Sequence, residues 1–134
     1  MRTQKLLSIV LSVGVLASAA PIFAHHSISA EFDTTKTITF TGTVKTVEWG
    51  NPHIYTQVEA KDATGKIHLY RVEGQPPNAL YRAGWRKDTL KVGQTVTVTG
   101  NPAKNAASPN VGQATIKTTD GKTVFSGNYQ ANPQ

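Results

Sequence analysis

The stretch that decides the fold is residues 75–100, QPPNALYRAGWRKDTLKVGQTVTVTG, where a helical pattern follows two prolines and then gives way to a strand. Asn78 is a suitable N-cap for a short helix from Ala79 to about Trp85, with Leu80 on its apolar stripe. After the turn that ends at Gly93, residues 94–100 alternate between apolar and polar side chains, which predicts a strand. We expect Val96 and Val98 to point into the core.

Three strands are predicted before this helix. Residues 37–49 form a long first strand that carries Gly42, and the apolar positions change phase after Val44, which indicates a bulge. Residues 53–60 form the second strand, with Ile54, Thr56, Val58 and Ala60 on one face. Residues 66–73 form the third, with Ile67 and Leu69 facing inward; a hairpin at 62–65 would then pair Lys61 with Lys66 and Glu59 with His68.

A final hairpin follows the polar loop 101–110: Asp120-Gly121 separates residues 111–118 from 122–126. The order is therefore three strands, one helix and two or three strands. This order predicts an all-β fold, a small OB-like barrel of five to six strands with one short helix between strands three and four. A small β-sandwich is the alternative, but it explains the position of the helix less well. The barrel domain covers residues 37–126, after an N-terminal arm at 25–36 and before a tail at 127–134.

The start of the chain has the three-part layout of a secretory signal peptide over residues 1–24. Arg2 and Lys5 precede an apolar run from Leu6 to Ala20, which is too short for a membrane helix of about 20 residues. Cleavage after Ala20 would place Pro21 directly behind the cut, so we favour cleavage after Ala24 and a mature start at His25. We therefore expect an exported protein, periplasmic or secreted, with no stable membrane insertion after cleavage.

The composition sets few further limits. The chain has 14 Lys and Arg against 8 Asp and Glu and no cysteine, which excludes disulfides and a lipidated N-terminal cysteine. The modest basic excess permits contact with an anionic partner without requiring one.

Several segments together resemble a family of small exported bacterial proteins catalogued as a domain of unknown function. The matching segments are His25-His26-Ser27, residues 31–33, 41–44, 47–53, 77–80, 84–93, 96–100 and 120–122. The resemblance implies export and a compact β domain, and it carries no activity and no catalytic residue.

Motifs for catalysis or phosphate binding are missing from the sequence. Gly121-Lys122-Thr123 looks like the end of a phosphate-binding loop, but Ile116 stands where that loop needs glycine. The carboxylates are scattered singly, so we expect no enzyme activity. Arg82, Arg86, Lys87 and Lys91 form the densest basic patch; we interpret them as cations suited to a helix C-terminus rather than as a nucleic-acid site, since exported proteins rarely meet nucleic acid.

The four histidines are the residues most suited to ligand binding, because imidazole is a common transition-metal ligand. In the predicted hairpin, His53 and His68 lie six positions apart, roughly 20 Å, and cannot share a metal ion. This leaves His25, His26 and His53 as candidate metal ligands, with copper the expected ion. Two modes remain open. His25 could chelate through its amine and ring with His53 adding a nitrogen, or His26 could bind through the amine, a backbone amide and its own ring.

The sequence thus predicts an exported binding or accessory protein that holds copper or another transition metal through these histidines. The alternative is a structural or partner-binding module of the cell envelope with no metal or small-molecule ligand. An envelope protein or a metal ion is the expected partner.

Overall fold

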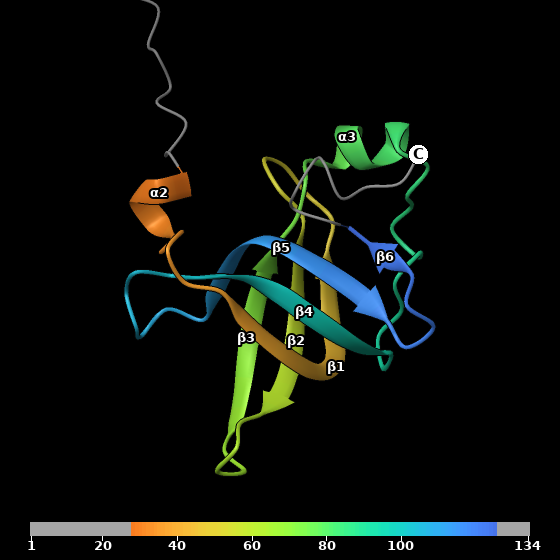
Figure 1. Cartoon of the computed structure of the whole chain (residues 1–134). Coiled ribbons are helices and arrows are strands. Elements are labelled where there is room, and N and C mark those ends of the chain that lie inside the picture. Colours follow the sequence, from red (N-terminus) through yellow and green to blue (C-terminus); the bar gives the residue numbers. More distant parts are fainter. Residues whose placement is uncertain (1–27, 126–134) are drawn as a thin grey trace, which may run out of the picture.

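The computed structural model describes residues 28–125 (Figure 1). Within this range, two short helices and six strands follow one another: α2 (Ile28–Glu31), β1 (Ile38–Glu48), β2 (Tyr55–Lys61), β3 (Ile67–Glu73), α3 (Pro77–Arg82), β4 (Thr95–Pro102), β5 (Asn110–Thr118) and β6 (Thr123–Val124). Among these residues, no helix is both long and apolar enough to cross a membrane.

The strands form a closed barrel of five strands with one extra strand on β5. Neighbouring strands follow the order β3-β2-β1-β4-β5-β6, and β3 also pairs with β5. That last pairing is parallel and short: Arg71 lies opposite Asn110 and Val72 opposite Val111. Closure through β3 and β5, with α3 between β3 and β4, confirms the predicted OB-like barrel.

The long first strand serves both sides of the barrel because it bends. β1 pairs with β2 through its second half and with β4 through its first half, and its register with β2 shifts between Val44 and Thr46. This shift is the predicted bulge. Gly42 lies where β1 crosses closest to β2: a Cβ atom there would lie 2.3 Å from the Glu59 carbonyl oxygen. Only glycine fits this position without moving the backbone.

The core is built from the alternating positions of the strands, closed at one end by α3 and the residues after it. Ile54, Thr56, Val58 and Ala60 are all buried, as their alternation predicts, and so are Val96 and Val98. The end of the barrel beneath α3 is filled by Leu80, Trp85, Leu90 and Phe125 together with half-buried Trp49.

The predicted orientation of β3 is wrong. Ile67 is 56% exposed and Leu69 48% exposed, whereas His68, Tyr70 and Val72 point inward. The cause is the pairing between β2 and β3, in which Lys61 lies opposite Ile67 and Ala60 opposite His68. A difference of one residue in the pairing reverses which side chains of a strand face the core.

The predicted helix also begins too late. α3 starts at Pro77 and ends at Arg82, its N-cap is Pro76, and no side chain caps it, so Asn78 is not the cap. Proline suits the first helical position because its missing N–H would lack a partner there anyway.

The segment before the barrel packs onto β4 and β5. Phe32 is 2% exposed and forms an isolated bridge with Ala103, while the amide of Lys104 donates to the Glu31 carbonyl. A Cβ atom on Gly112 would lie 2.5 Å from the Phe32 ring, so this glycine makes room for the aromatic side chain. In Figure 1, α2 accordingly lies on the same side as the β4–β5 loop.

Candidate functional site

His53 lies between Pro52 and β2, at the end of the barrel where β3 also ends. Its Nδ1 atom is 3.0 Å from the Gly74 carbonyl oxygen and 3.7 Å from Oε1 of Glu73. Because a carbonyl oxygen only accepts, Nδ1 carries a proton and donates it, so Nε2 is the ring nitrogen through which His53 could bind a ligand. The ring is about one-third exposed, at 35% of its side-chain surface. This arrangement resembles that of metal-binding histidines, whose second nitrogen donates to a carbonyl or carboxylate.

The Glu73 carboxylate behind this ring is partly withdrawn from water. Burial raises the pKa of Glu73 above its usual range; the positive charge of protonated His53 acts in the opposite direction, and the negative charge of Glu31 raises the pKa further. Oε1 of Glu31 also accepts from the side-chain Nδ2 of Asn110, 2.8 Å away, which holds this carboxylate against β5.

Polar and charged side chains also cover the outer face of β2 and β3 next to His53. The Arg71 guanidinium carbon lies 3.3 Å from the centre of the Tyr55 ring, and an Arg71 nitrogen is 3.4 Å from Oε2 of Glu48. Burial raises the pKa of the Tyr55 hydroxyl, and the negative charge of Glu73 adds to this effect. This stacked cation–π and ion-pair network orders the face next to His53.

The structure places only one of the three predicted metal ligands. His25 and His26 lie outside the described residues. Of the three, the structure describes His53. Within residues 28–125, no three His, Asp or Glu side chains are grouped so that they could hold a metal ion. A site at His53 therefore depends on nitrogen or oxygen ligands from elsewhere in the chain.

His68 belongs to a different part of the barrel. Its Nε2 atom is 2.7 Å from Oδ2 of Asp62, not beside Glu59 as the predicted hairpin required. His53 and His68 lie at opposite ends of the β2–β3 pair, next to Glu73 and Asp62 respectively.

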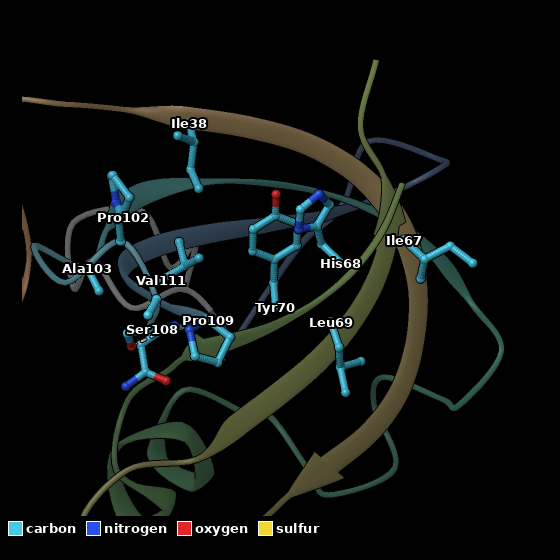
Figure 2. Close-up of a pocket in the computed structure, with 13 residues that line it drawn as sticks. Ile38, Ile67, His68, Leu69, Tyr70, Pro102, Ala103, Ser108, Pro109 and Val111 are labelled. Atoms are coloured by element: carbon cyan, nitrogen blue, oxygen red, sulfur yellow. Dashed lines mark hydrogen bonds between the residues drawn. The ribbon is translucent and has the colours of Figure 1, made fainter. Parts of the chain in front are cut away.

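A hollow of about 510 Å³ that the sequence did not predict opens between the first half of β3 and the β4–β5 loop (Figure 2). In Figure 2 the Tyr70 and His68 rings lie side by side and extend from β3 toward Ile38 of β1, while Leu69 points the other way. Finding this hollow needed the correct β2–β3 register, which the alternation of apolar residues in β3 did not supply.

One residue of the basic patch near α3, Arg86, contacts the C-terminal end of this helix. The Arg86 guanidinium donates to the Tyr81 carbonyl at 3.2 Å and to the Trp85 carbonyl at 2.8 Å. For Arg86 the interpretation as a cation at a helix C-terminus is confirmed, since its charge contacts a carbonyl in the last turn of α3.

Comparison with protein families matches residues 12–112 to a family described as a family of unknown function, DUF6152. The chain belongs to the DUF6152 family. The match extends from the N-terminal apolar segment through all strands up to the start of β5, and it includes His25, His26 and His53. It confirms the resemblance stated from the sequence motifs. No curated protein and no solved structure matches the chain.

Proposed function

We propose that this DUF6152 protein is an exported binding or accessory protein that holds Cu(II) between its mature N-terminus and His53. The observation that carries the proposal is the orientation of the His53 ring. Its Nδ1–H is fixed by the Gly74 carbonyl, and Glu73 lies behind it. Nε2 is therefore the ring nitrogen left to bind a metal ion, and its direction is fixed, which lowers the entropic cost of binding.

The remaining ligands would come from a chain that is cleaved after Ala24 and begins at His25. The new α-amine and the His25 imidazole have ordinary pKa values of about 7.7–8.0 and 6.5, so near neutral pH few protons must be displaced when metal binds. Nitrogen ligands in a tetragonal arrangement favour Cu(II), which also heads the affinity order of the divalent ions.

The position of α2 supports this pairing of the N-terminus with His53. Glu31, the last residue of α2, accepts a hydrogen bond from the Asn110 side chain, and Asn110 lies opposite Arg71 on β3, two residues before Glu73. His25 precedes Ile28, the first residue of α2, by three positions, and three extended residues span about 10 Å. The mode that uses His25 and His53 requires this segment to extend from α2 toward the end of β3, and we favour it over the mode in which His26 binds without help from the barrel.

The test is a Cu(II) titration of the mature protein beginning at His25. His53→Ala should weaken binding at least about tenfold, while the matched control His68→Ala should leave affinity unchanged, because His68 bonds Asp62 at the other end of the strand pair. One extra serine before His25 should also weaken binding, since it moves the amine away from the ring.

Two results would contradict the proposal. Equal affinity in wild type and His53→Ala would show that His53 takes no part and that the N-terminus binds without help from the barrel. Equal affinity in wild type and a variant lacking both His25 and His26 would rule out the copper site altogether and favour the alternative of a partner-binding module without metal.

A further inference from the structure

The first half of β3 has an open edge. The Arg71 amide donates to the Pro109 carbonyl, on the side of β3 that faces away from β2. Because backbone groups alternate along a strand, those of Ile67 and Leu69 point to the same side as those of Arg71. The β3–β5 ladder begins at Arg71, and within residues 28–125 no strand pairs with this edge at Ile67 or Leu69.

This edge lacks the features by which proteins keep an edge strand unpaired. Residues 67–69, Ile-His-Leu, contain no lysine, proline or glycine, and their register with β2 is regular. Ile67 and Leu69 are both exposed apolar side chains. In Figure 1 the β2–β3 hairpin extends past the other strands, so its tip projects from the barrel. An exposed apolar edge of this kind favours pairing with another strand.

A second copy of the chain can pair with this edge about a two-fold axis in a register that uses free backbone groups alone. When Ile67 of each copy lies opposite Leu69 of the other, the two residues exchange both of their backbone hydrogen bonds. Ile67 opposite Ile67 would place Leu69 opposite Gly65, whose amide is already bonded within the 62–65 turn. Leu69 opposite Leu69 would place Ile67 opposite Arg71, whose amide is already bonded to Pro109.

The length of the free edge matches the length of strand that a second copy supplies. In the register with Ile67 opposite Leu69, Lys66 of the second copy lies opposite Tyr70, and its turn at 62–65 begins opposite Arg71. The second copy therefore turns away into its own β2 at the point where β5 already occupies the edge. Its turn lies at the hollow, whose other wall includes Ser108 and Pro109 of the β4–β5 loop.

The charges across this register are complementary. Lys66 forms no salt bridge within residues 28–125, and it would lie diagonally beside His68 of the second copy, on the same face of the sheet. Nε2 of His68 is 2.7 Å from Oδ2 of Asp62, so the ammonium group of Lys66 approaches a carboxylate. On the other face, Ile67 meets Leu69, and the two apolar side chains shield each other from water.

We propose that the protein forms a two-fold symmetric dimer through the open edge of β3. Ile67 of each copy lies opposite Leu69 of the other, and the two His68 residues face each other at the axis. The dimer joins the two β2–β3 hairpins into one antiparallel sheet and leaves no free edge at this point, so it does not grow further. It goes beyond the proposed copper function and does not depend on His53, which lies at the other end of the strand pair.

A single engineered cysteine tests the register directly, because the chain has no cysteine of its own. His68→Cys places two thiols opposite each other at the axis, where the Cα atoms of a non-hydrogen-bonded pair lie about 4.5 Å apart, within reach of a disulfide. Ile67→Cys is the matched control, because its two copies lie two residues out of register, roughly 9 Å apart. With oxidised glutathione, we expect the mature His68→Cys protein to form a covalent dimer at least tenfold faster than Ile67→Cys.

The concentration dependence of the protein without cysteine gives a second measurement, made with a chelator present so that copper takes no part. The paired segment is short, so we expect a weak dimer at NMR concentrations, roughly 0.1 to 1 mM. Over this range, hydrogen exchange of the Ile67 and Leu69 amides should slow at least threefold. The Arg71 amide, already bonded to Pro109, is the internal control and should change little.

Two substitutions at one position separate the backbone from the side chain. Leu69→Pro removes an N–H from the open edge and should weaken association at least tenfold. Leu69→Thr keeps that N–H and should weaken association less. Thermal melts check that each variant is folded, and the cysteine measurement stands if Leu69→Pro is not.

The proposal would be overturned by a protein that stays monomeric across this concentration range. It would also be overturned by crosslinking of Ile67→Cys as fast as that of His68→Cys, or by association that is unchanged in folded Leu69→Pro.

Discussion

Asp62 organises the turn between β2 and β3 almost alone. Its Oδ1 accepts from the Thr64 amide at 2.8 Å, from the Thr64 hydroxyl at 2.6 Å and from the Lys66 amide at 3.1 Å, while Oδ2 lies 2.7 Å from Nε2 of His68. The hydrogen bond from the Thr64 hydroxyl, followed by that from His68, holds the pKa of this carboxyl well below its usual 3.8. The charged carboxylate therefore adds to the two backbone hydrogen bonds of the turn, from Asp62 to Lys66 and from Gly65 to Asp62.

Replacing Asp62 by Asn should destabilise the protein in a pH-dependent way. A carboxyl whose pKa is lower in the folded state contributes stability that is full above its unfolded pKa and is lost as pH falls through the folded value. In urea unfolding, the midpoint of wild type should exceed that of Asp62→Asn at pH 7, and the difference should shrink once pH falls below about 3.8.

Asp88→Asn, a change at an exposed residue outside this turn, controls for the change in net charge. A difference between wild type and Asp62→Asn that stays constant from pH 7 to pH 3 would contradict the role assigned to the charged carboxylate.

The arm before β1 contributes one large buried side chain to the barrel. Phe32 fills the space above Gly112, and the Asp33 amide donates to the Pro102 carbonyl at 2.9 Å. The arm is thereby attached to the β4–β5 region by an aromatic anchor with hydrogen bonds on both sides of it.

Phe32→Ala should detach the arm from an otherwise intact barrel. Loss of a buried phenylalanine typically costs about 3 kcal/mol or more, which corresponds to roughly hundredfold faster exchange of the amides that depend on it. We expect this acceleration for the Asp33 and Lys104 amides in hydrogen exchange, with protection in β1 and β2 retained. Ile28→Ala, on the same arm but 46% exposed in wild type, should change little. Unchanged exchange at Asp33 and Lys104 would show that Phe32 does not anchor the arm.

At the level of elements, the sequence predicted what local patterns determine and missed what depends on pairing. The bulge after Val44, the buried face of β2 and the turn at Gly121, whose φ is +81°, follow from local periodicity and turn chemistry. The orientation of β3 did not follow from its own periodicity. Ile67 and Leu69 are apolar yet exposed, so their alternation favours the wrong face. Packing of the arm was also missed, because Phe32 is the one buried residue within 28–36 and a single aromatic residue gives no periodic pattern.

For the whole molecule, the order of strands with one helix between the third and fourth was enough to predict barrel closure. β3 borders both a residue that the sequence identified and a hollow that it did not. Its C-terminal end lies beside His53, which sequence reasoning selected, and its first half lines the hollow, which sequence reasoning missed.

The most direct test of the central claim, a copper site shared by the N-terminus and His53, is pulsed electron paramagnetic resonance of the Cu(II)-loaded mature protein. The remote nitrogen of each bound imidazole modulates the electron spin echo, so the measurement counts the histidine rings on the metal. We predict two rings in wild type and in His68→Ala, and one ring in His53→Ala. The same echo modulation in wild type and His53→Ala would contradict the account, because it would show that the His53 ring never reaches the metal.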